Sequence, residues 1–226
     1  MTAALESHPT AGAPFSTVIR EASRAQHEEA EGSGFGTALV EGRLRREGYA
    51  ALMAQTYFVY SALEEVTAAQ REDPVGGQFF LPQLFRLPSI ERDLDHLIGL
   101  DWRGAITPLP STARYADRIR SVGSSWAGGF VAHHYTRYLG DLSGGQIIRR
   151  VLHRAYGLST DGVRFYIFDE IPKPKPFKDL YRARLDAAPW DDAERMRVVA
   201  EVQEAFRLNT ALFADLGRDL DRYLVD

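Results

Sequence analysis

The 226-residue chain contains no cysteine. Disulfide bonds, iron–sulfur clusters and metal centres built on thiolate ligands are therefore excluded. A surplus of basic residues is also lacking, because 27 lysines and arginines stand against 31 aspartates and glutamates and give a formal net charge of −4. General nucleic-acid binders carry a basic stripe, so the composition predicts no nucleic-acid partner.

Long apolar runs are missing as well. No uninterrupted apolar segment approaches the length that crosses a membrane, and residues 1–14 lack the basic and apolar regions of a signal peptide. We therefore expect a soluble, cytoplasmic protein without a membrane anchor, acting as a monomer.

What the chain does contain is helical periodicity along nearly its whole length, with no internal repeat and no run of alternating, strand-like segments. This pattern predicts an all-α fold. Since 45% of the residues are hydrophobic and no long linker divides them, residues 15–226 are expected to form one domain. Residues 1–14 contain Pro9, Gly12 and Pro14 among small residues and are predicted to be a disordered tail.

Caps and helix breakers divide the chain into elements. Helices are predicted over about residues 16–31, 46–70, 89–98, 111–122, 125–156 and 191–223, with another opening near residue 177. Ser89 and Asp191 are the candidate N-caps, and breaks are expected at Gly32–Gly34 and Asp73–Gly77. The residues expected to face inward on the second helix are Leu52, Tyr57, Tyr60 and Leu63, and those expected to form a rigid loop are Pro172, Pro174 and Pro176.

The most informative feature is a set of glycines inside the fifth predicted helix. Gly140 and Gly144 stand four residues apart, so they share one helix face, although each interior glycine costs about 1 kcal/mol relative to alanine. Close packing against another helix is one explanation for such a face. The other is a flat or bulky ligand lying against the backbone, with Arg137, Asp141 and Ser143 within a turn to supply polar groups.

Histidines are the remaining candidates for a metal site. They are His8, His27, His96, His133, His134 and His153. A carboxylate di-iron bundle needs two Glu-x-x-His motifs, and the nearest match is the single Asp93-x-x-His96. A serine hydrolase is poorly supported, because no Gly-x-Ser-x-Gly elbow occurs. His133 and His134 are adjacent, so on a helix they point about 100° apart and cannot serve one site, and packing is their expected role.

His27 stands out by its helical spacing. Arg20 precedes it by seven residues and lies on nearly the same side of the predicted helix, and Glu31 lies one turn beyond. An imidazole, a cation and an orienting carboxylate would suit an anionic metallo-cofactor. A solvated helix face is the alternative. A planar macrocycle held between this helix and the glycine face would account for both features.

Five segments carry a family resemblance. In chain order they are Ala25–Glu31, Tyr60–Glu65, Val131–Gly145, Phe177–Arg182 and Phe206–Asn209. Over roughly residues 15–216 the chain thereby resembles the heme oxygenases, particularly the soluble bacterial kind that produces biliverdin. The resemblance implies a single-domain helical fold with heme between a proximal and a distal helix.

The same resemblance implies roles for individual residues. His27 is similar to the proximal iron ligand and Glu31 to its hydrogen-bond partner. Gly140 and Gly144 are similar to the distal-helix glycines, and Asp141 to the residue that organises distal water. The implied network members are Arg137, Tyr60 and Asn209, and the implied heme-binding contacts are Arg20, Tyr135, Lys178, Arg182 and Ser143. Two departures from the family pattern are Arg20, where lysine is common, and the pair Pro174 and Pro176, which stiffens the approach to Lys178.

The implied activity is the oxidative cleavage of heme (iron protoporphyrin IX), which is both substrate and cofactor, to biliverdin, carbon monoxide and ferrous iron with O2. Because no flavin or nicotinamide fingerprint occurs, a separate electron donor is expected, either a ferredoxin, a flavodoxin or a reductase. The basic residues that could bind propionates, dock an acidic donor or simply be solvated are Lys173, Lys175, Lys178, Arg182 and Arg184. A heme storage or sensing protein and a helical protein without heme are the alternatives.

Overall fold

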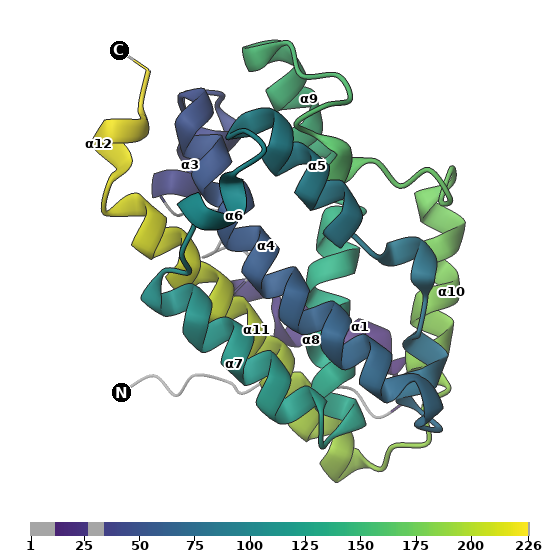
Figure 1. Ribbon diagram of the computed structural model, residues 1–226. Coiled ribbons are helices and arrows are strands. Elements are labelled where there is room, and N and C mark those ends of the chain that lie inside the picture. Colours follow the sequence, from purple (N-terminus) through teal and green to yellow (C-terminus); the bar gives the residue numbers. More distant parts are fainter. Residues whose placement is uncertain (1–11, 27–33, 226) are drawn as a thin grey trace, which may run out of the picture.

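The computed structural model describes residues 12–26 and 34–225 of the chain (Figure 1). The helices are α1 (Phe15–Ala22), α3 (Gly34–Val40), α4 (Arg46–Ala69), α5 (Leu87–Leu97), α6 (Trp102–Ala105), α7 (Pro110–Gly123), α8 (Ala127–Asp141), α9 (Gly145–Tyr156), α10 (Pro174–Asp186), α11 (Asp192–Gly217) and α12 (Leu220–Tyr223). Short 3-10 turns lie at η1 (Gln70–Glu72), η2 (Gly76–Phe79), η3 (Pro82–Leu84) and η4 (Arg164–Tyr166). Within the described ranges there is no strand, and an isolated bridge pairs Leu44 with Leu224. The all-α prediction is confirmed.

Four helices, α4, α7, α8 and α11, pack against one another and enclose the core. In Figure 1, α4, α7 and α11 run along a common diagonal, α8 crosses behind them, and α10 lies on the opposite side of the molecule. The core is rich in fully buried tyrosines, namely Tyr49, Tyr60, Tyr115, Tyr138 and Tyr181. Since a buried phenol needs a hydrogen-bond partner, this composition brings polar chemistry into an otherwise apolar interior.

The first and tenth helices are joined across the chain. The backbone N–H of Ser16 donates to Asp186 Oδ1 at 2.7 Å, and its Oγ donates to Asp186 Oδ2 at 3.1 Å. The α1 helix also packs against α11. Residues 170 positions apart in the sequence therefore hold α1 and α10 together.

Several predicted elements are confirmed closely. The α4 helix ends one residue before its predicted end, and Leu52, Tyr60 and Leu63 on it are buried, whereas Tyr57 is half-buried against Trp102. Asp191 caps α11 by accepting the Glu194 N–H at 2.8 Å. At Asp191 the boundary is marked by a local capping residue.

Four boundaries are wrong. The α5 helix begins at Leu87, so Ser89 lies inside it, and α10 begins at Pro174 rather than near Phe177. Proline is tolerated there because the first N–H groups of a helix have no partner within the helix. Gly34, an expected breaker, instead begins α3, and the last predicted helix is interrupted after Gly217 before α12 resumes.

The predicted first helix is also divided. The α1 helix ends at Ala22, Ser23 forms a turn in which both its N–H and its Oγ donate to the Ile19 carbonyl, and residues 24–26 are helical again. The argument that Arg20 and His27 share a face assumed one unbroken helix. The turn at Ser23 contradicts this assumption. Helical spacing therefore no longer gives the angle between Arg20 and a residue beyond the turn.

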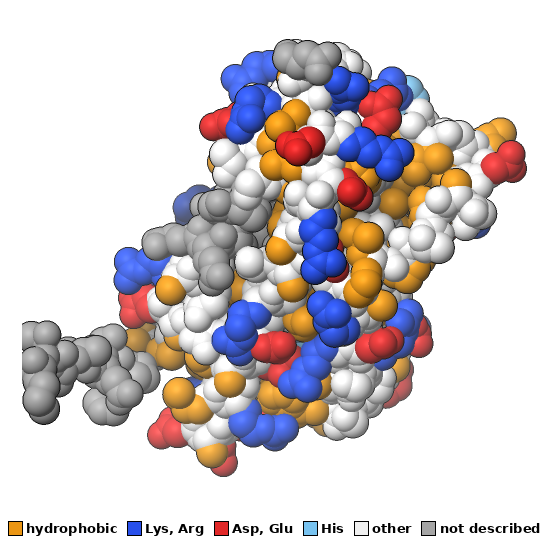
Figure 2. All heavy atoms as spheres, turned by 90° about the vertical axis from the view of Figure 1, so that its left-hand side faces the viewer, with side chains coloured by type: hydrophobic (Ala, Val, Ile, Leu, Met, Phe, Trp, Pro, Cys, Tyr) orange, Lys and Arg blue, Asp and Glu red, His pale blue; other side chains and the backbone are white. Residues whose placement is uncertain are grey.

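None of the described helices is long and apolar enough to cross a membrane. On the face formed by the left-hand side of Figure 1, basic and acidic side chains are interspersed with apolar ones (Figure 2). Charge is therefore not segregated by sign on that face, which agrees with the absence of a basic stripe in the composition.

Candidate functional site

The glycine face at the junction of α8 and α9 is open. A Cβ added to Gly140 would have no described atom within 4 Å, and one added to Gly144 would meet only the Gly140 carbonyl oxygen at 3.8 Å. Gly128, at the start of the same helix, is the opposite case, since its Cβ would lie 2.7 Å from Trp126 Nε1 and 2.8 Å from Val198 Cγ2. Among the described residues, close helix packing therefore explains Gly128 but not Gly140 or Gly144.

The helix axis is interrupted at this face. The α8 helix ends at Asp141 and α9 begins at Gly145, so the predicted continuous helix over residues 125–156 is wrong. The Ser143 N–H donates to the Gly140 carbonyl at 3.0 Å, a tighter turn than the α-helix makes. Glycine is one of the residue types at which helices commonly kink or break. The break presents backbone, rather than side chains, at the open face.

Asp141 is a buried carboxyl group at the end of α8. Its Oδ2 accepts a hydrogen bond from the phenol of Tyr60 on α4. Burial raises the pKa of Asp141 above its ordinary value, while the charge of Arg137, the Tyr60 hydrogen bond and the charge of Arg86 oppose that rise. A buried carboxyl with a raised pKa beside a cation is a candidate acid–base group.

Arg137 lies one helical turn before Asp141 and joins α8 to α11. Its Nη1 donates to Asn209 Oδ1 at 2.7 Å, and its guanidinium lies 5.1 Å from the centroid of the Tyr60 ring. Its Nε is buried without a hydrogen-bond partner among the described residues. The structure therefore brings Tyr60, Arg137, Asp141 and Asn209 from three different helices into one polar cluster.

Tyr60 is held by aromatic neighbours. The rings of Tyr138 and Phe165 lie 5.6 and 5.2 Å from it, both edge to face. Phe165 belongs to η4, which is anchored by Asp93, because the Asp93 carboxylate accepts the backbone N–H groups of Arg164 at 2.9 Å and Phe165 at 2.8 Å. Burial raises the pKa of Asp93 to about 6, although these N–H bonds lower it. Asp93, weighed from the sequence as half of a metal motif, thus supports the wall behind Tyr60.

Lys178 contacts the glycine turn, and two further cations from separate helices lie near Tyr135. Lys178 on α10 donates from Nζ to Ser143 Oγ at 2.8 Å, so its position is determinate despite the prolines that precede it. Burial raises the pKa of Tyr135 on α8, and the nearby charges of Arg182 and Arg20 lower it. The candidate heme-binding residues of α1, α8, α10 and the α8–α9 turn are therefore neighbours.

The other basic residues that the sequence grouped with Lys178 and Arg182 have different surroundings. Lys175 pairs with Asp179 at 2.9 Å, and its side chain is 87% exposed. Arg184 donates to the Gln78 carbonyl, and Lys173 is exposed. Of these five basic residues, Lys178 contacts Ser143 and Arg182 lies near Tyr135.

His27 and Glu31 lie outside the described residues. His133 and His134 are fully buried, and the expectation that they pack rather than share a site is confirmed. His134 Nδ1 lies 2.8 Å from Tyr181 Oη, and burial lowers the pKa of His134 to about 3. His133 contacts Glu201, a buried carboxylate that the sequence did not single out because its partners lie more than sixty residues away.

Comparisons with known proteins agree with this geometry. The family model for heme oxygenase matches residues 13–215. Heme oxygenase from Pyropia yezoensis is 39% identical over 88% of this chain and 84% of its own length, and heme oxygenase 1 from Synechocystis is 37% identical over 89% and 84%. The crystal structure of Synechocystis heme oxygenase-1 in complex with heme superposes with a TM-score of 0.89 at 36% identity, covering 93% of this chain and 95% of that one. The chain belongs to the heme oxygenase family.

Proposed function

We propose that this protein binds heme at the α8–α9 junction as its substrate and cleaves it to biliverdin, carbon monoxide and ferrous iron, using O2 and electrons from a separate donor. Family membership supports the reaction, since heme oxygenases are oxidoreductases that cleave heme. The relatives crystallised with heme support the substrate.

The observation that carries the proposal is the open face of Gly140 and Gly144. A flat macrocycle needs a wall without side chains, and this face supplies one next to a buried acid and several cations. The residues present therefore fit heme. The propionates of heme would pair with Lys178, Arg182 and Arg20, which a tetrapyrrole without acidic groups could not do.

We assign the iron ligand to His27 and its orienting hydrogen bond to Glu31, on the strength of the Ala25–Glu31 motif. A neutral imidazole whose second nitrogen donates to a carboxylate is held in one orientation and one tautomer. Both residues lie outside the described part of the chain, so this assignment rests on the family resemblance.

When bound, heme supplies the iron that takes up O2 and the macrocycle that is cleaved. We assign the proton supply to Asp141. Its Oδ2 is engaged by Tyr60, whereas Oδ1 accepts no hydrogen bond from the described residues and so is the atom that can hold a water. The Tyr60 hydrogen bond and the charge of Arg137 hold the carboxyl in place, so that it can pass a proton to that water and recover one from solvent.

The glycine face restricts where the reaction occurs. Because Gly140 and Gly144 project no side chain, backbone can lie directly over the macrocycle and limit the space above the iron. A bulky side chain there would exclude the macrocycle itself. Orientation by this backbone would select the carbon that is attacked.

A separate electron donor is part of the proposal. We propose an acidic donor, such as a ferredoxin, a flavodoxin or a reductase, attracted by the cations around the start of α10. Opposite charges steer transient partners and raise the rate of encounter. Monomeric and cytoplasmic character remain predictions from the sequence.

The test is a single turnover. Purified protein is mixed with heme, and ascorbate is added under air. We expect the visible spectrum of the heme complex to give way to that of biliverdin, with one carbon monoxide released per heme. Stable heme binding without biliverdin would favour the storage or sensing alternative, and no heme binding would reject the proposal.

A further inference from the structure

Glu201 is a buried carboxylate away from the open glycine face. It lies on α11 and is 4% exposed, and its two oxygens receive three hydrogen bonds. Arg118 of α7 donates from Nε to Oε1 at 2.9 Å and from Nη2 to Oε2 at 2.5 Å, while His133 Nε2 of α8 lies 2.9 Å from Oε1. Because an ionised carboxylate only accepts, His133 is the donor in this contact.

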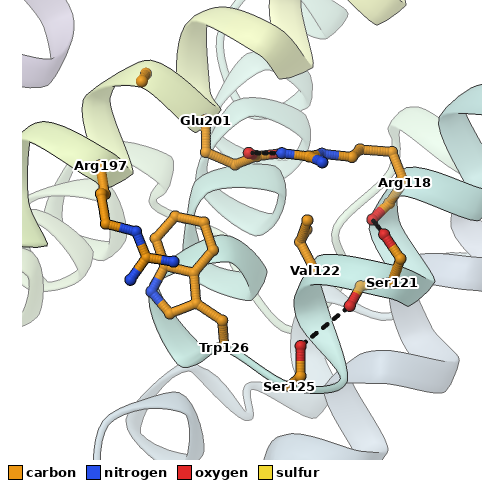
Figure 3. Close-up of a pocket in the computed structure, with 8 residues that line it drawn as sticks. Arg118, Ser121, Val122, Ser125, Trp126, Arg197 and Glu201 are labelled. Carbon is orange, nitrogen blue, oxygen red and sulfur yellow. Dashed lines mark hydrogen bonds and ion pairs between the residues drawn. The ribbon is translucent and has the colours of Figure 1, made fainter.

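The Glu201 cluster joins three helices at one point. Figure 3 shows the Arg118 guanidinium reaching from α7 to Glu201 beside a surface hollow of about 370 Å³, with Arg197 lying over the Trp126 ring at the other side. Burial alone would raise the pKa of Glu201, but the hydrogen bonds from His133 and Arg118 lower it to about 2. The Glu201 carboxylate therefore stays charged in the neutral range.

The position of His133 on α8 links this cluster to the candidate site. His133, Arg137 and Asp141 are spaced four residues apart, so they form one ridge along the helix. Two side-chain contacts tie this ridge to α11, namely His133 to Glu201 and Arg137 to Asn209. A rotation of α8 about its axis would move Arg137 and Asp141 together and would have to break the Glu201 contact.

A buried ion cluster is a weak way to gain stability, because apolar side chains of similar size often do as well. Its better-attested use is to impose a unique register, which an apolar contact does not. In the Glu201 cluster, the helix whose rotation matters is α8, because its C-terminal end carries Asp141.

We propose that Glu201 is a positioning residue that, through His133, sets the rotation of α8 and thereby the placement of Arg137 and Asp141. This inference rests on the proposed function for its catalytic meaning. The positioning itself is a property of the protein without heme.

The test uses Glu201→Gln and, because that variant could fold poorly, also Arg118→Met, which removes a surface-exposed donor. The control is Glu204→Gln on the same helix, where the half-buried carboxylate pairs with Arg207 at 2.9 Å and makes no hydrogen bond to His133. In the heme-free protein, amide hydrogen exchange is compared between residues 137–142 and α5. We expect exchange at residues 137–142 to accelerate about tenfold in Glu201→Gln, and by less in Arg118→Met, with α5 and the control unchanged.

A second readout is the pH midpoint of the visible spectrum of the ferric heme complex, which we expect to shift in Glu201→Gln and not in Glu204→Gln. Equal acceleration in α5 and residues 137–142, or an unchanged segment in both folded variants, would overturn the inference. A wild-type protein that forms no biliverdin would instead reject the proposed function, and the exchange comparison would still decide whether Glu201 positions α8.

Discussion

The surroundings of Asp141, including its hydrogen bond from Tyr60, determine the pKa of its carboxyl group. The side chain is taken out of water, which raises its pKa, and one hydrogen bond and two neighbouring cations limit the rise. Burial and the surrounding charges therefore act on the pKa of this group in opposite directions.

Replacing this carboxyl tests its role. We expect Asp141→Asn to bind heme nearly as well as the wild type, because the amide is isosteric, but to lose biliverdin yield by about 100-fold or more, the usual scale for a missing general acid. With hydrogen peroxide, oxidation of an added phenol should increase. Asp117→Asn, at an exposed position on α7, is the control. Wild-type biliverdin yield in Asp141→Asn would remove Asp141 from the proton supply.

His134 offers a prediction about acid stability. Its pKa falls from about 6.5 in the unfolded chain to about 3 in the buried site, so between these values the unfolded state binds more protons than the folded state. The free energy of unfolding should therefore decrease as the pH drops below 6.5, by up to about 1.4 kcal/mol per pH unit from this group.

The measurement is denaturant unfolding between pH 7 and pH 5. We expect His134→Gln, which removes the titration but can still bond Tyr181, to lose less stability over this range than the wild type. His153→Gln, an exposed position on α9, should follow the wild-type curve. Identical slopes in His134→Gln and the wild type would show that other groups cause the acid sensitivity.

At the scale of elements, α8 contains glycines with two different purposes. Gly128 lies where a Cβ would collide with Trp126 and Val198, and Gly140 lies where a Cβ would meet no described atom. The same residue type on one helix therefore supports tight packing at one end and an open face at the other.

Two leucine substitutions separate these purposes. Gly144→Leu should leave the heme-free protein as stable as the wild type or up to about 1 kcal/mol more stable, because Gly144 has a right-handed α backbone (φ −61°, ψ −36°) that leucine adopts with a smaller loss of conformational entropy than glycine. Its heme affinity should fall at least about tenfold, since the side chain fills the proposed site. Gly128→Leu should instead destabilise the heme-free protein by about 1–3 kcal/mol through overpacking. Thermal unfolding and heme titration measure both. A destabilised Gly144→Leu with normal heme affinity would contradict the assignment.

Helix boundaries marked by a local residue signal could be predicted from the sequence, whereas boundaries without such a signal could not. The Asp191 cap is a local signal, and it was found. Helical periodicity continues through the turn at Ser23 and the break after Asp141, so the pattern of apolar residues reveals neither. In the site, the described motif residues Tyr60, Arg137, Asp141 and Asn209 do meet, but Asp93 and Glu201 were not expected to contribute. Their partners are backbone N–H groups and side chains far away in the chain, which no local pattern reveals.

At the scale of the whole molecule, the net charge of −4 contrasts with the cations around α10. Local charge of this kind can guide an acidic partner even when the protein as a whole is acidic.

Lys173→Glu tests this steering. The residue is exposed beside the start of α10, where an acidic side chain is compatible with the helix dipole, so folding should be unaffected. We expect reduction of bound heme by an acidic ferredoxin to slow about three- to tenfold at low salt and to depend less on ionic strength, with heme affinity unchanged. Arg114→Glu, an exposed position on α7, changes the net charge equally and should have little effect. Equal slowing in both variants would indicate a general charge effect.

The contact between Ser16 and Asp186 has a consequence for how the molecule is made. The helix that carries Arg20 is held to the helix that carries Lys178 and Arg182 by residues 170 positions apart. Closing so long a loop is slow compared with local helix formation, and during synthesis it cannot happen before residue 186 has left the ribosome. We therefore expect the heme-binding side to be completed among the last steps of folding, so that a nascent chain cannot capture heme while its core is still unformed.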